Sequence, residues 1–330
     1  MCLSEPDSAV IESVGSTSGD ILLLGAGGKI GHCLALMARR AFDVAKRNSD
    51  VIAVSRFSAP GVREQFENDR IRTIKCDLTE PDAVAALPDA PQVVFMVGQK
   101  FGTAAGSAAD TWLLNCFVPG LVAERYANSR IVVYSSGNVY PFTAADGDAP
   151  AEDHALGPVG EYAQSVLGRE RVFESFSRRF HTLMTIVRLN YANEPRYGVL
   201  VDVAHDVLNK RPVELGMGHA NIVWATDANR ITLRSFDIAT SPPKLLNLAG
   251  PKVRVRDAAR RFGEEFGVEP IFQGREADTA LLSNGAHCWN TFGPPSVGVE
   301  QMVHRVADWL KAGHATWDKP THFEVRDGKF

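Results

Sequence analysis

Three glycines near the amino terminus have the spacing of a loop that binds phosphate groups. Gly25, Gly28 and Gly31 form a GxxGxxG pattern between the apolar run 21–24 and a stretch with helical spacing. In such a loop Gly25 permits a tight turn, Gly28 lets the backbone approach a pyrophosphate, and Gly31 lets the helix pack closely on the sheet. The first N–H groups of the helix then point at the anion. The pattern therefore predicts dinucleotide binding.

The ends of the next two expected strands bear on the form of the coenzyme. Proteins that bind NAD usually place a carboxylate after the second strand to accept the ribose 2′-hydroxyl, but this chain has Ser55 and Arg56 there. A hydroxyl followed by an arginine suits a 2′-phosphate, so NADP is favoured, NAD remains possible, and a solvated surface arginine is the alternative. Asp77 follows the third strand, where it could accept from the adenine amino group or cap a helix near Pro81.

The elements that must position these residues alternate between strands and helices. Short apolar runs predict buried parallel strands at 21–24, 51–55, 71–75, 93–97, 131–134 and 185–189. Helical spacing predicts helices at 30–40, 108–127, 159–179, 255–266 and 299–310, and Pro119 should kink or split the second of these. Repeated β-α units predict an α/β fold of the Rossmann type, a doubly wound parallel sheet.

The same pattern divides the chain. Residues 1–18 are polar with little apolar periodicity, which predicts a loose, flexible leader. Residues 19–190 are expected to form the NAD(P)-binding Rossmann domain, to which 226–249 return with one more strand at 244–248. The mixed, turn-rich segments 191–225 and 250–330 predict a smaller substrate-binding lobe.

Composition narrows the partners. The 330 residues carry a formal net charge of −4, which gives no basic footprint for nucleic acid or an anionic membrane. The five cysteines are scattered, and His205, His219 and His287 have no ligand spacing, so we expect neither disulfides nor a metal site. There is no apolar run of about 20 residues and no secretory signal, which indicates a cytoplasmic protein with small-molecule partners.

A family resemblance emerges from motifs further along the chain. Tyr134-Ser135-Ser136 ends the fifth strand, and a helix begins near Gly160 with Glu161-Tyr162. Together with the glycine pattern, Asp77-Leu78, Asn115 and Val187-Arg188-Leu189-Asn190, these motifs resemble the extended short-chain dehydrogenase/reductase family, which includes NAD-dependent epimerases and dehydratases. The resemblance runs from about residue 20 to 311.

The resemblance implies which residues carry the chemistry. In that family a Ser, a Tyr and a Lys four residues after the Tyr act together; by position the first two are Ser136 and Tyr162, but the third is Val166. A lysine one helical turn away lowers the pKa of the phenol and holds the nicotinamide ribose, and valine does neither. Arg169 or Lys100 could supply positive charge instead, although an exposed charge is the simpler interpretation of each.

The expected cofactor-binding set combines the glycine loop with the family positions. Its members are Gly25, Gly28, Lys29, Ile30, Gly31, Arg56, Asp77, Leu78, Gly98, Asn115, Ser135, Tyr162 and Leu189. The family also implies a homodimer, formed by helices around 113–126 and 162–176.

The substrate side is less specific. Arg196, Arg230 and Arg275 could serve an anionic substrate such as a nucleotide sugar, but an uncharged sugar, a polyol or a keto acid remains open. Residues 224–230 and 279–284 are expected either to line the outer wall of the pocket or to pack within the lobe.

Two functions follow from these features. The first is an NAD(P)-dependent oxidoreductase, epimerase or dehydratase that acts on a sugar-like or other hydroxyl or keto compound through an atypical site. The second is a non-catalytic NAD(P)-binding regulator or sensor, which needs no reactive phenolate. Proton-only chemistry such as isomerisation is a third possibility.

Overall fold

The largest sheet has seven strands, which come from residues 21 to 248. The computed structural model describes residues 3–99 and 107–329. The strands follow the order β12-β7-β5-β4-β1-β2-β3. Their bounds are β1 (Ile21–Leu24), β2 (Val51–Ser55), β3 (Arg72–Lys75), β4 (Gln92–Phe95), β5 (Arg130–Ser136), β7 (Met184–Leu189) and β12 (Lys244–Leu248). The pairs β1/β2, β2/β3, β1/β4 and β4/β5 are parallel, so the strand order reverses beside β1. Ligands of doubly wound sheets bind at such a reversal, beyond the carboxyl ends of the strands.

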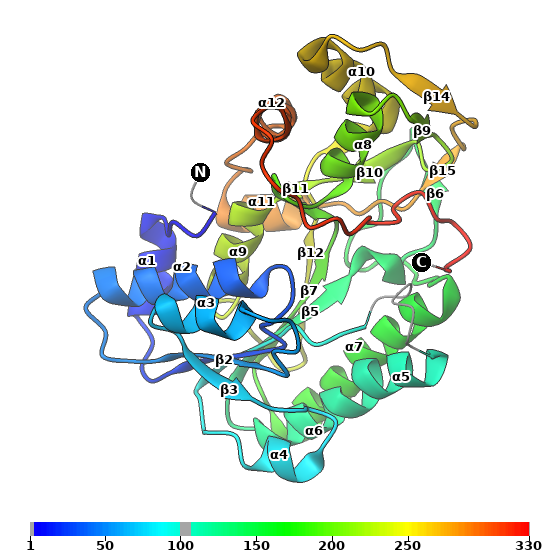
Figure 1. The fold of residues 1–330 in the computed structure, drawn as a ribbon. Helices are drawn as coiled ribbons and strands as arrows, with labels where there is room; N and C mark the ends of the chain where they lie inside the picture. The colour runs from blue at the N-terminus through cyan, green and yellow to red at the C-terminus, as the bar shows by residue number, and fades with distance from the viewer. Residues whose placement is uncertain (1–2, 100–106, 330) are drawn as a thin grey trace. The chain divides into compact units, whose positions relative to one another are not determined.

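Helices cover both faces of this sheet. Alternate strand residues face opposite sides, and Leu22, Val93 and Ile131 belong to one buried cluster with Val122 and Phe173. Figure 1 shows α2 and α3 on one side of the sheet and α4 and α6 on the other. The helices are α2 (Gly31–Val44), α3 (Val62–Asn68), α4 (Pro81–Ala85), α5 (Ala108–Trp112), α6 (Val118–Arg125) and α7 (Gly160–Phe180).

The helix expected at 108–127 is divided before its proline. Residues Leu113–Phe117 form a π-helical turn between α5 and α6, and the N–H of Val118 donates to the carbonyl of Leu113. Pro119 follows within the first turn of α6. Because proline has no N–H, it cannot satisfy the carbonyl of Asn115, and the wider turn accommodates this.

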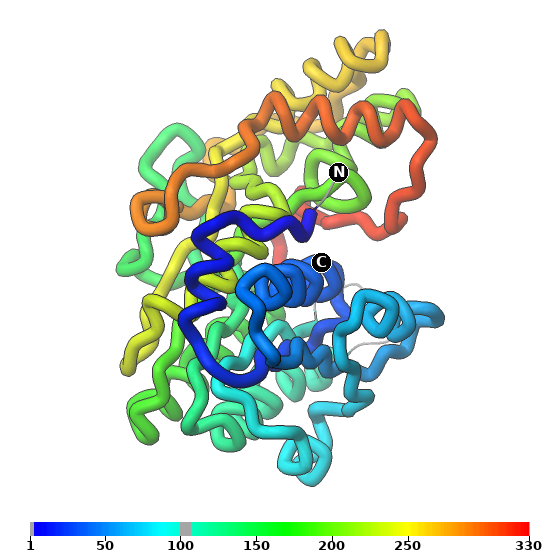
Figure 2. Tube along the Cα trace, turned by 90° about the vertical axis from the view of Figure 1, so that its left-hand side faces the viewer, coloured from blue at the N-terminus to red at the C-terminus, as the bar shows by residue number. Residues whose placement is uncertain are grey.

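Part of the segment predicted as a leader has regular structure. Residues Ser8–Gly15 form α1, whose N-cap Asp7 accepts a hydrogen bond from the N–H of Val10 at 2.8 Å. Val10 and Val14 are buried, and α1 runs beside α2 in both Figure 1 and Figure 2. Val10 and Val14, four residues apart, place apolar side chains on one face of this short helix. Because most of the neighbouring residues are polar, this pattern is hard to recognise in the sequence.

The chain forms two compact units. The first comprises residues Met1–Ser135, Gln164–Val187 and Asn229–Leu246, and the second comprises Ser136–Ala163, Arg188–Ala228 and Asn247–Phe330. In the second unit α8 (Val199–Leu208), α10 (Val255–Phe266) and α12 (Val299–Lys311) pack together (Figure 2). The other elements there are η2 (Gly137–Val139) and α11 (Ala286–Phe292), with α9 (Ala225–Arg234) beginning in this unit.

Four two-stranded sheets complete the second unit. They pair β9 (Pro212–Glu214) with β14 (Ile271–Gln273), β10 (His219–Asn221) with β13 (Lys252–Arg254), β11 (Val223–Trp224) with β8 (Ala192–Asn193), and β15 (Thr279–Ala280) with β6 (Thr143–Ala144). After α12 the chain continues as an irregular segment to residue 329. Across the described ranges, no helix is both long and apolar enough to cross a membrane.

Candidate active site

The glycine loop lies between β1 and α2. Gly25 has φ +85°, and a Cβ there would lie 2.8 Å from the backbone nitrogen of Val97. A Cβ on Gly31 would lie 1.9 Å from the carbonyl oxygen of Ala26, whereas one on Gly28 would meet nothing closer than 3.5 Å. The first and third glycines are thus required by the fold itself. Gly28 is exposed, and the open space beside it is where a ligand can approach the backbone.

The start of α2 has the character of an anion site. Ile30 occupies its N-cap position, where an apolar side chain cannot accept hydrogen bonds from the first-turn N–H groups. Two backbone hydrogen bonds shape the loop before the helix. The N–H of Gly28 donates to the carbonyl of Gly25, and the N–H of Gly31 donates to the carbonyl of Gly28, both at 3.3 Å. The helix start, with its partial positive charge, therefore lies directly after the exposed loop residues, which is the arrangement that phosphate binding requires.

A cavity of about 360 Å³ opens beside this loop, within the first unit. It gathers six residues of the expected cofactor set, namely Gly25, Gly28, Arg56, Asp77, Leu78 and Gly98. Ser55 and Phe57 also line it. Because β1, β2, β3 and β4 all end here, residues far apart in the sequence meet at the reversal point of the sheet.

Arg56 and Asp77 both line this cavity, and their opposite charges interact. Asp77 Oδ1 accepts from the N–H of Thr79 at 3.1 Å and from its hydroxyl at 2.8 Å. These bonds, with a smaller contribution from the charge of Arg56, hold the pKa of Asp77 below its usual value. Glu80, not Asp77, occupies the N-cap of α4, so Asp77 forms a turn with Thr79 and does not cap the helix.

A buried polar network lies behind the cavity. Asn115 is fully buried; its Nδ2 donates to Ser165 Oγ at 2.8 Å, and its Oδ1 accepts from Arg169. Arg169 Nη1 donates to the carbonyl of Tyr134 at 2.8 Å. Arg169 is only 5% exposed, so the interpretation of it as an exposed charge is wrong. Its Nη2 would lie 2.6 Å from a Cβ on Gly98, which places the guanidinium against the cavity wall.

Ser135 is held by a second buried residue of α7. Its hydroxyl donates to Glu170 Oε1 at 2.5 Å, and both residues are buried. Sequence reasoning missed Glu170. The signal available was its spacing, because it lies eight residues after Tyr162 and therefore on a similar face of the helix.

Ser136 and Tyr162 belong to the second unit. The Ser136 hydroxyl donates to Asn138 Oδ1 at 2.9 Å and accepts from the N–H of Asn138 at 3.2 Å. Tyr162 is half-buried in the first turn of α7. Val166, one turn later, is fully buried.

Two further tyrosines, Tyr191 and Tyr197, interact electrostatically with Tyr162, and the sequence analysis gave them no role. Burial raises the pKa of Tyr191, and the charges of Glu324 and Tyr162 add to the effect. Burial also raises the pKa of Tyr197, with contributions from Asp202 and Tyr162. The sequence showed these phenols only as parts of a loop, because nothing local indicates that the carboxyl-terminal segment returns to them.

The arginines considered for an anionic substrate have different environments. Arg196 forms a two-pronged contact with Glu194, with distances of 2.7 to 3.0 Å. Arg230 pairs with Asp7 at 3.0 Å. Arg275 is exposed. Two of the three are therefore engaged by carboxylates of the protein.

The remaining expected residues are distributed as follows. Lys29 is exposed, Ile30 and Leu189 are half-buried, and Lys100 lies outside the described residues. Trp224 is 1% exposed and packs in the core, whereas Leu282, Ser283 and Asn284 line a cavity of about 500 Å³ in the second unit.

One group on the surface has the residue types of a metal site. Glu265, His304 and Asp308 bring their ligand atoms within 4.8 Å of one another. Lys311 Nζ lies 2.8 Å from Glu265 and 3.5 Å from Asp308, so a lysine cation already offsets part of the negative charge of these two carboxylates.

Solved structures with the same fold are numerous. An epimerase from Methanothermobacter thermautotrophicus superimposes with a TM-score of 0.75 at 17% identity, covering 94% of this chain and 97% of that one. A UDP-glucuronic acid 4-epimerase mutant from Bacillus cereus, solved with NAD and UDP-4-deoxy-4-fluoro-glucuronic acid, gives 0.76 at 16% identity, covering 89% of this chain and 100% of that one. A UDP-glucose 4-epimerase from Thermotoga maritima, solved with UDP-glucose, gives 0.72 at 16%, covering 89% and 99%. These similarities confirm the predicted Rossmann-type fold.

Sequence comparison identifies the family. No curated protein sequence compared with this chain gives a significant match. A family profile, however, matches residues 21–209, which is more than half of the chain and includes the glycine loop, Ser136 and Tyr162. The protein belongs to the NAD dependent epimerase/dehydratase family.

Proposed function

We propose that this protein is an NAD(P)-dependent enzyme, an epimerase, dehydratase or oxidoreductase, that acts on a hydroxyl-bearing carbon of a sugar-like substrate. The observation that carries the proposal is the cavity at the glycine loop, which gathers Gly25, Gly28, Arg56, Asp77 and Gly98 beside the start of α2. An exposed glycine with room for a ligand and an anion-binding helix start fit a dinucleotide pyrophosphate.

The coenzyme proposed is NADP, with NAD as the alternative. Arg56 is exposed at the end of β2 and lines the cavity, where a guanidinium suits a 2′-phosphate. Asp77 is close enough for its charge to interact with that of Arg56, and it suits the adenine amino group. The coenzyme in the Bacillus cereus structure is NAD, so the proposed preference for NADP rests on Arg56 alone.

The chemical step is proposed to use Ser136 and Tyr162. A bound nicotinamide supplies a hydride acceptor and donor. Ser136 would orient the substrate oxygen by a hydrogen bond from its hydroxyl, and Tyr162 Oη would take the proton from the substrate hydroxyl and return it. A phenol with no nearby cation has a pKa near 10, so only about one molecule in a thousand is ionised at neutral pH.

We propose that Arg169 partly replaces the missing lysine at the ribose. Its guanidinium is buried and lies against Gly98 in the cofactor cavity, where a positive charge favours an ionised neighbour. Arg169 occurs seven residues after Tyr162, on a similar face of α7.

A test begins with coenzyme binding. Calorimetry with NADP and NAD should show binding of at least one, and the purified protein should oxidise or reduce nicotinamide with a sugar-like substrate. Tyr162→Phe should abolish turnover while coenzyme affinity changes little. If neither coenzyme binds, the proposal is wrong.

The second candidate is a non-catalytic NAD(P) sensor, and the fully buried Val166 favours it. A sensor would bind NADP tightly, show no turnover with any substrate offered, and gain none in Val166→Lys. Turnover that depends on Tyr162 would exclude it.

A homodimer is also proposed. Trp112, Leu113 and Phe117 are 37%, 39% and 46% exposed along α5 and the π-helical turn, and such an apolar surface favours burial against a second copy. Light scattering should give twice the monomer mass, and Phe117→Glu should yield monomers that keep the wild-type circular dichroism spectrum.

A further inference from the structure

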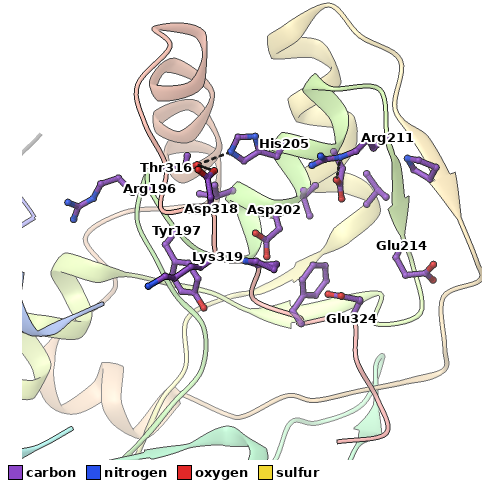
Figure 3. A pocket seen from close by; sticks show the side chains of 17 residues that line it. Arg196, Tyr197, Asp202, His205, Arg211, Glu214, Thr316, Asp318, Lys319 and Glu324 are labelled. Carbon is purple, nitrogen blue, oxygen red and sulfur yellow. Dashed lines mark hydrogen bonds and ion pairs between the residues drawn. The ribbon is translucent and has the colours of Figure 1, made fainter. Parts of the chain in front are cut away.

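The second unit holds a cavity of about 450 Å³, and the sequence analysis assigned no role to most of the residues that line it. Figure 3 shows it between α8, the end of β9 and the carboxyl-terminal segment 316–324. Its volume is within the range of about 300 to 1,000 Å³ that small-molecule sites occupy. The carboxyl-terminal segment 316–324 forms one wall and residues 196–214 form the others, so segments about a hundred residues apart in the sequence meet in one site.

Carboxylates outnumber cations among the charged side chains of the lining. Asp202, Glu214 and Glu324 lie around the hollow on three different segments (Figure 3). Asp202 Oδ2 accepts from the N–H and the hydroxyl of Thr321 at 2.8 and 2.6 Å, which leaves Oδ1 with acceptor capacity. Glu214 Oε1 accepts from the N–H groups of the next two residues, 215 and 216, at 3.1 and 3.0 Å. Ionised carboxylates only accept hydrogen bonds, so the cavity is rich in acceptors.

The positive charges of the cavity are largely engaged. Arg196 contacts Glu194 in two-pronged fashion, and its guanidinium lies 4.7 Å from the ring centre of Trp317. Arg211 donates to Asp206 at 2.9 Å. Of the lining side chains, three are permanently cationic and five are carboxylic, so the cavity carries an excess of negative charge. A phosphate group would be repelled there.

One tyrosine of the cavity wall interacts with the proposed proton-transfer residue, Tyr162. Tyr197 lines it, and the charges of Asp202 and Tyr162 both act on the Tyr197 phenol. Glu324, another lining residue, acts on Tyr191, which Tyr162 also influences. Burial raises the pKa of Asp202, and Glu324 and Asp206 raise it further. Tyr197 is thus both a wall of the cavity and a phenol on which the charge of Tyr162 acts, and these residues all belong to one unit.

We propose that this cavity binds the substrate, and that the substrate is an unphosphorylated polyhydroxy compound, a free sugar or cyclic polyol, held by hydroxyl hydrogen bonds to Asp202 and Glu324. The identification of this compound as the substrate rests on the proposed function, whereas its binding to the cavity does not. Hydroxyl donors match an acceptor-rich wall, whereas the diphosphate of a nucleotide sugar would face five carboxylic side chains against three cations, two of which already contact carboxylates.

The test measures binding directly, with the full-length protein and saturating NADP. Saturation-transfer NMR titrations would use D-glucose, D-galactose, D-xylose and myo-inositol as probes, with UDP-glucose as the phosphorylated comparison. At least one free probe should bind, and its affinity should change less than twofold between about 0.05 and 0.5 M salt, because no charge pairing is involved.

Variants assign the binding to this cavity. Glu324→Gln, a change on a partly exposed side chain that should not affect folding, is expected to weaken the free probe about tenfold, as loss of a charged acceptor does. Lys319→Met should change it less than twofold. Glu269→Gln is the matched control, because Glu269 is an exposed carboxylate of the same unit that does not line the cavity.

Each result bears on the inference separately from the proposed function. Binding of UDP-glucose with none of the free probes, or a free probe whose affinity is unaffected by Glu324→Gln, overturns the inference. Failure of every probe to bind also overturns it. If a free probe binds but neither coenzyme does, the proposed function fails and the cavity assignment stands.

Discussion

Two alanine substitutions in the glycine loop should separate folding from coenzyme binding. At Gly31 an added Cβ would lie 1.9 Å from the carbonyl oxygen of Ala26, which is 1.5 Å short of ordinary contact at 3.4 Å. The obstruction is backbone, which cannot rotate away. Overpacking of this kind costs about 1–3 kcal/mol, and we expect Gly31→Ala to reach the upper end. At about 2–4 °C per kcal/mol, the melting temperature should fall by roughly 6–12 °C.

Gly28→Ala is the matched substitution. Its Cβ would meet only the carbonyl oxygen of Gly25, at 3.5 Å, and Gly28 is not among the glycines with positive φ. Stability should therefore change by less than about 1 kcal/mol. The methyl group would, however, stand where the pyrophosphate approaches the loop, and the loss of one or two charge-assisted hydrogen bonds should weaken NADP binding about 100-fold.

The assays are differential scanning fluorimetry for stability and calorimetry for NADP and NAD. The reasoning is refuted if Gly31→Ala has the same melting temperature as the wild-type protein, or if Gly28→Ala binds coenzyme as tightly as the wild type. Equal losses of stability in both variants, with coenzyme affinity unchanged in both, would show that the loop is only a structural turn.

Three other predictions concern the coenzyme, the catalytic residues and the pH range. Arg56→Ala should raise the dissociation constant of NADP about tenfold or more and that of NAD less than twofold in parallel calorimetry, because only NADP carries the 2′-phosphate. If the protein is an enzyme, Val166→Lys should shift the alkaline pKa of the kcat/KM profile downward, since a cation favours the phenolate of Tyr162; an unchanged profile would count against proton transfer by Tyr162. Burial raises the pKa of Tyr126 and of Tyr134 to about 12, from about 10 when unfolded, so their contribution to stability is complete below pH 10 and is lost as the pH rises toward 12, by up to about 3 kcal/mol each. Urea unfolding across this range should show a shallower decline in Tyr126→Phe than in the wild type.

Hydrophobic patterning was sufficient for most of the sheet. The predicted strands 21–24, 51–55 and 244–248 have the same bounds as β1, β2 and β12, because each is a short apolar run between turn residues. The strand predicted at 71–75 begins one residue later, at Arg72. As an edge strand β3 is half-exposed, so its apolar signal is weak.

The site was predictable where it depends on local spacing. Arg56, Asp77 and Gly98 each follow a strand, and parallel strands bring their carboxyl ends to one edge of a sheet, so their shared cavity follows from topology. The burial of Arg169 could not be predicted in this way. Its partners are the side chain of Asn115 and the carbonyl of Tyr134, and neither contact leaves a pattern in the sequence around Arg169.

The carboxyl-terminal cavity was missed for a similar reason. Thr321 reaches Asp202 across more than a hundred residues of chain, and the segment that contains it has no helical or strand periodicity. Only long-range side-chain contacts hold it in place, and single-sequence patterning does not detect them.

Two glycines fix the path of the last residues. Gly160, at the start of α7, and Gly328 approach so closely that a Cβ on the first would lie 2.6 Å from the carbonyl oxygen of the second, and a Cβ on the second 2.6 Å from the Cα of the first. Both have positive φ, so alanine at either position also strains the backbone. A methyl group on either glycine would therefore force the two backbone segments apart. The segment around Gly328 would then lose its contact with the start of α7, the helix that carries Tyr162.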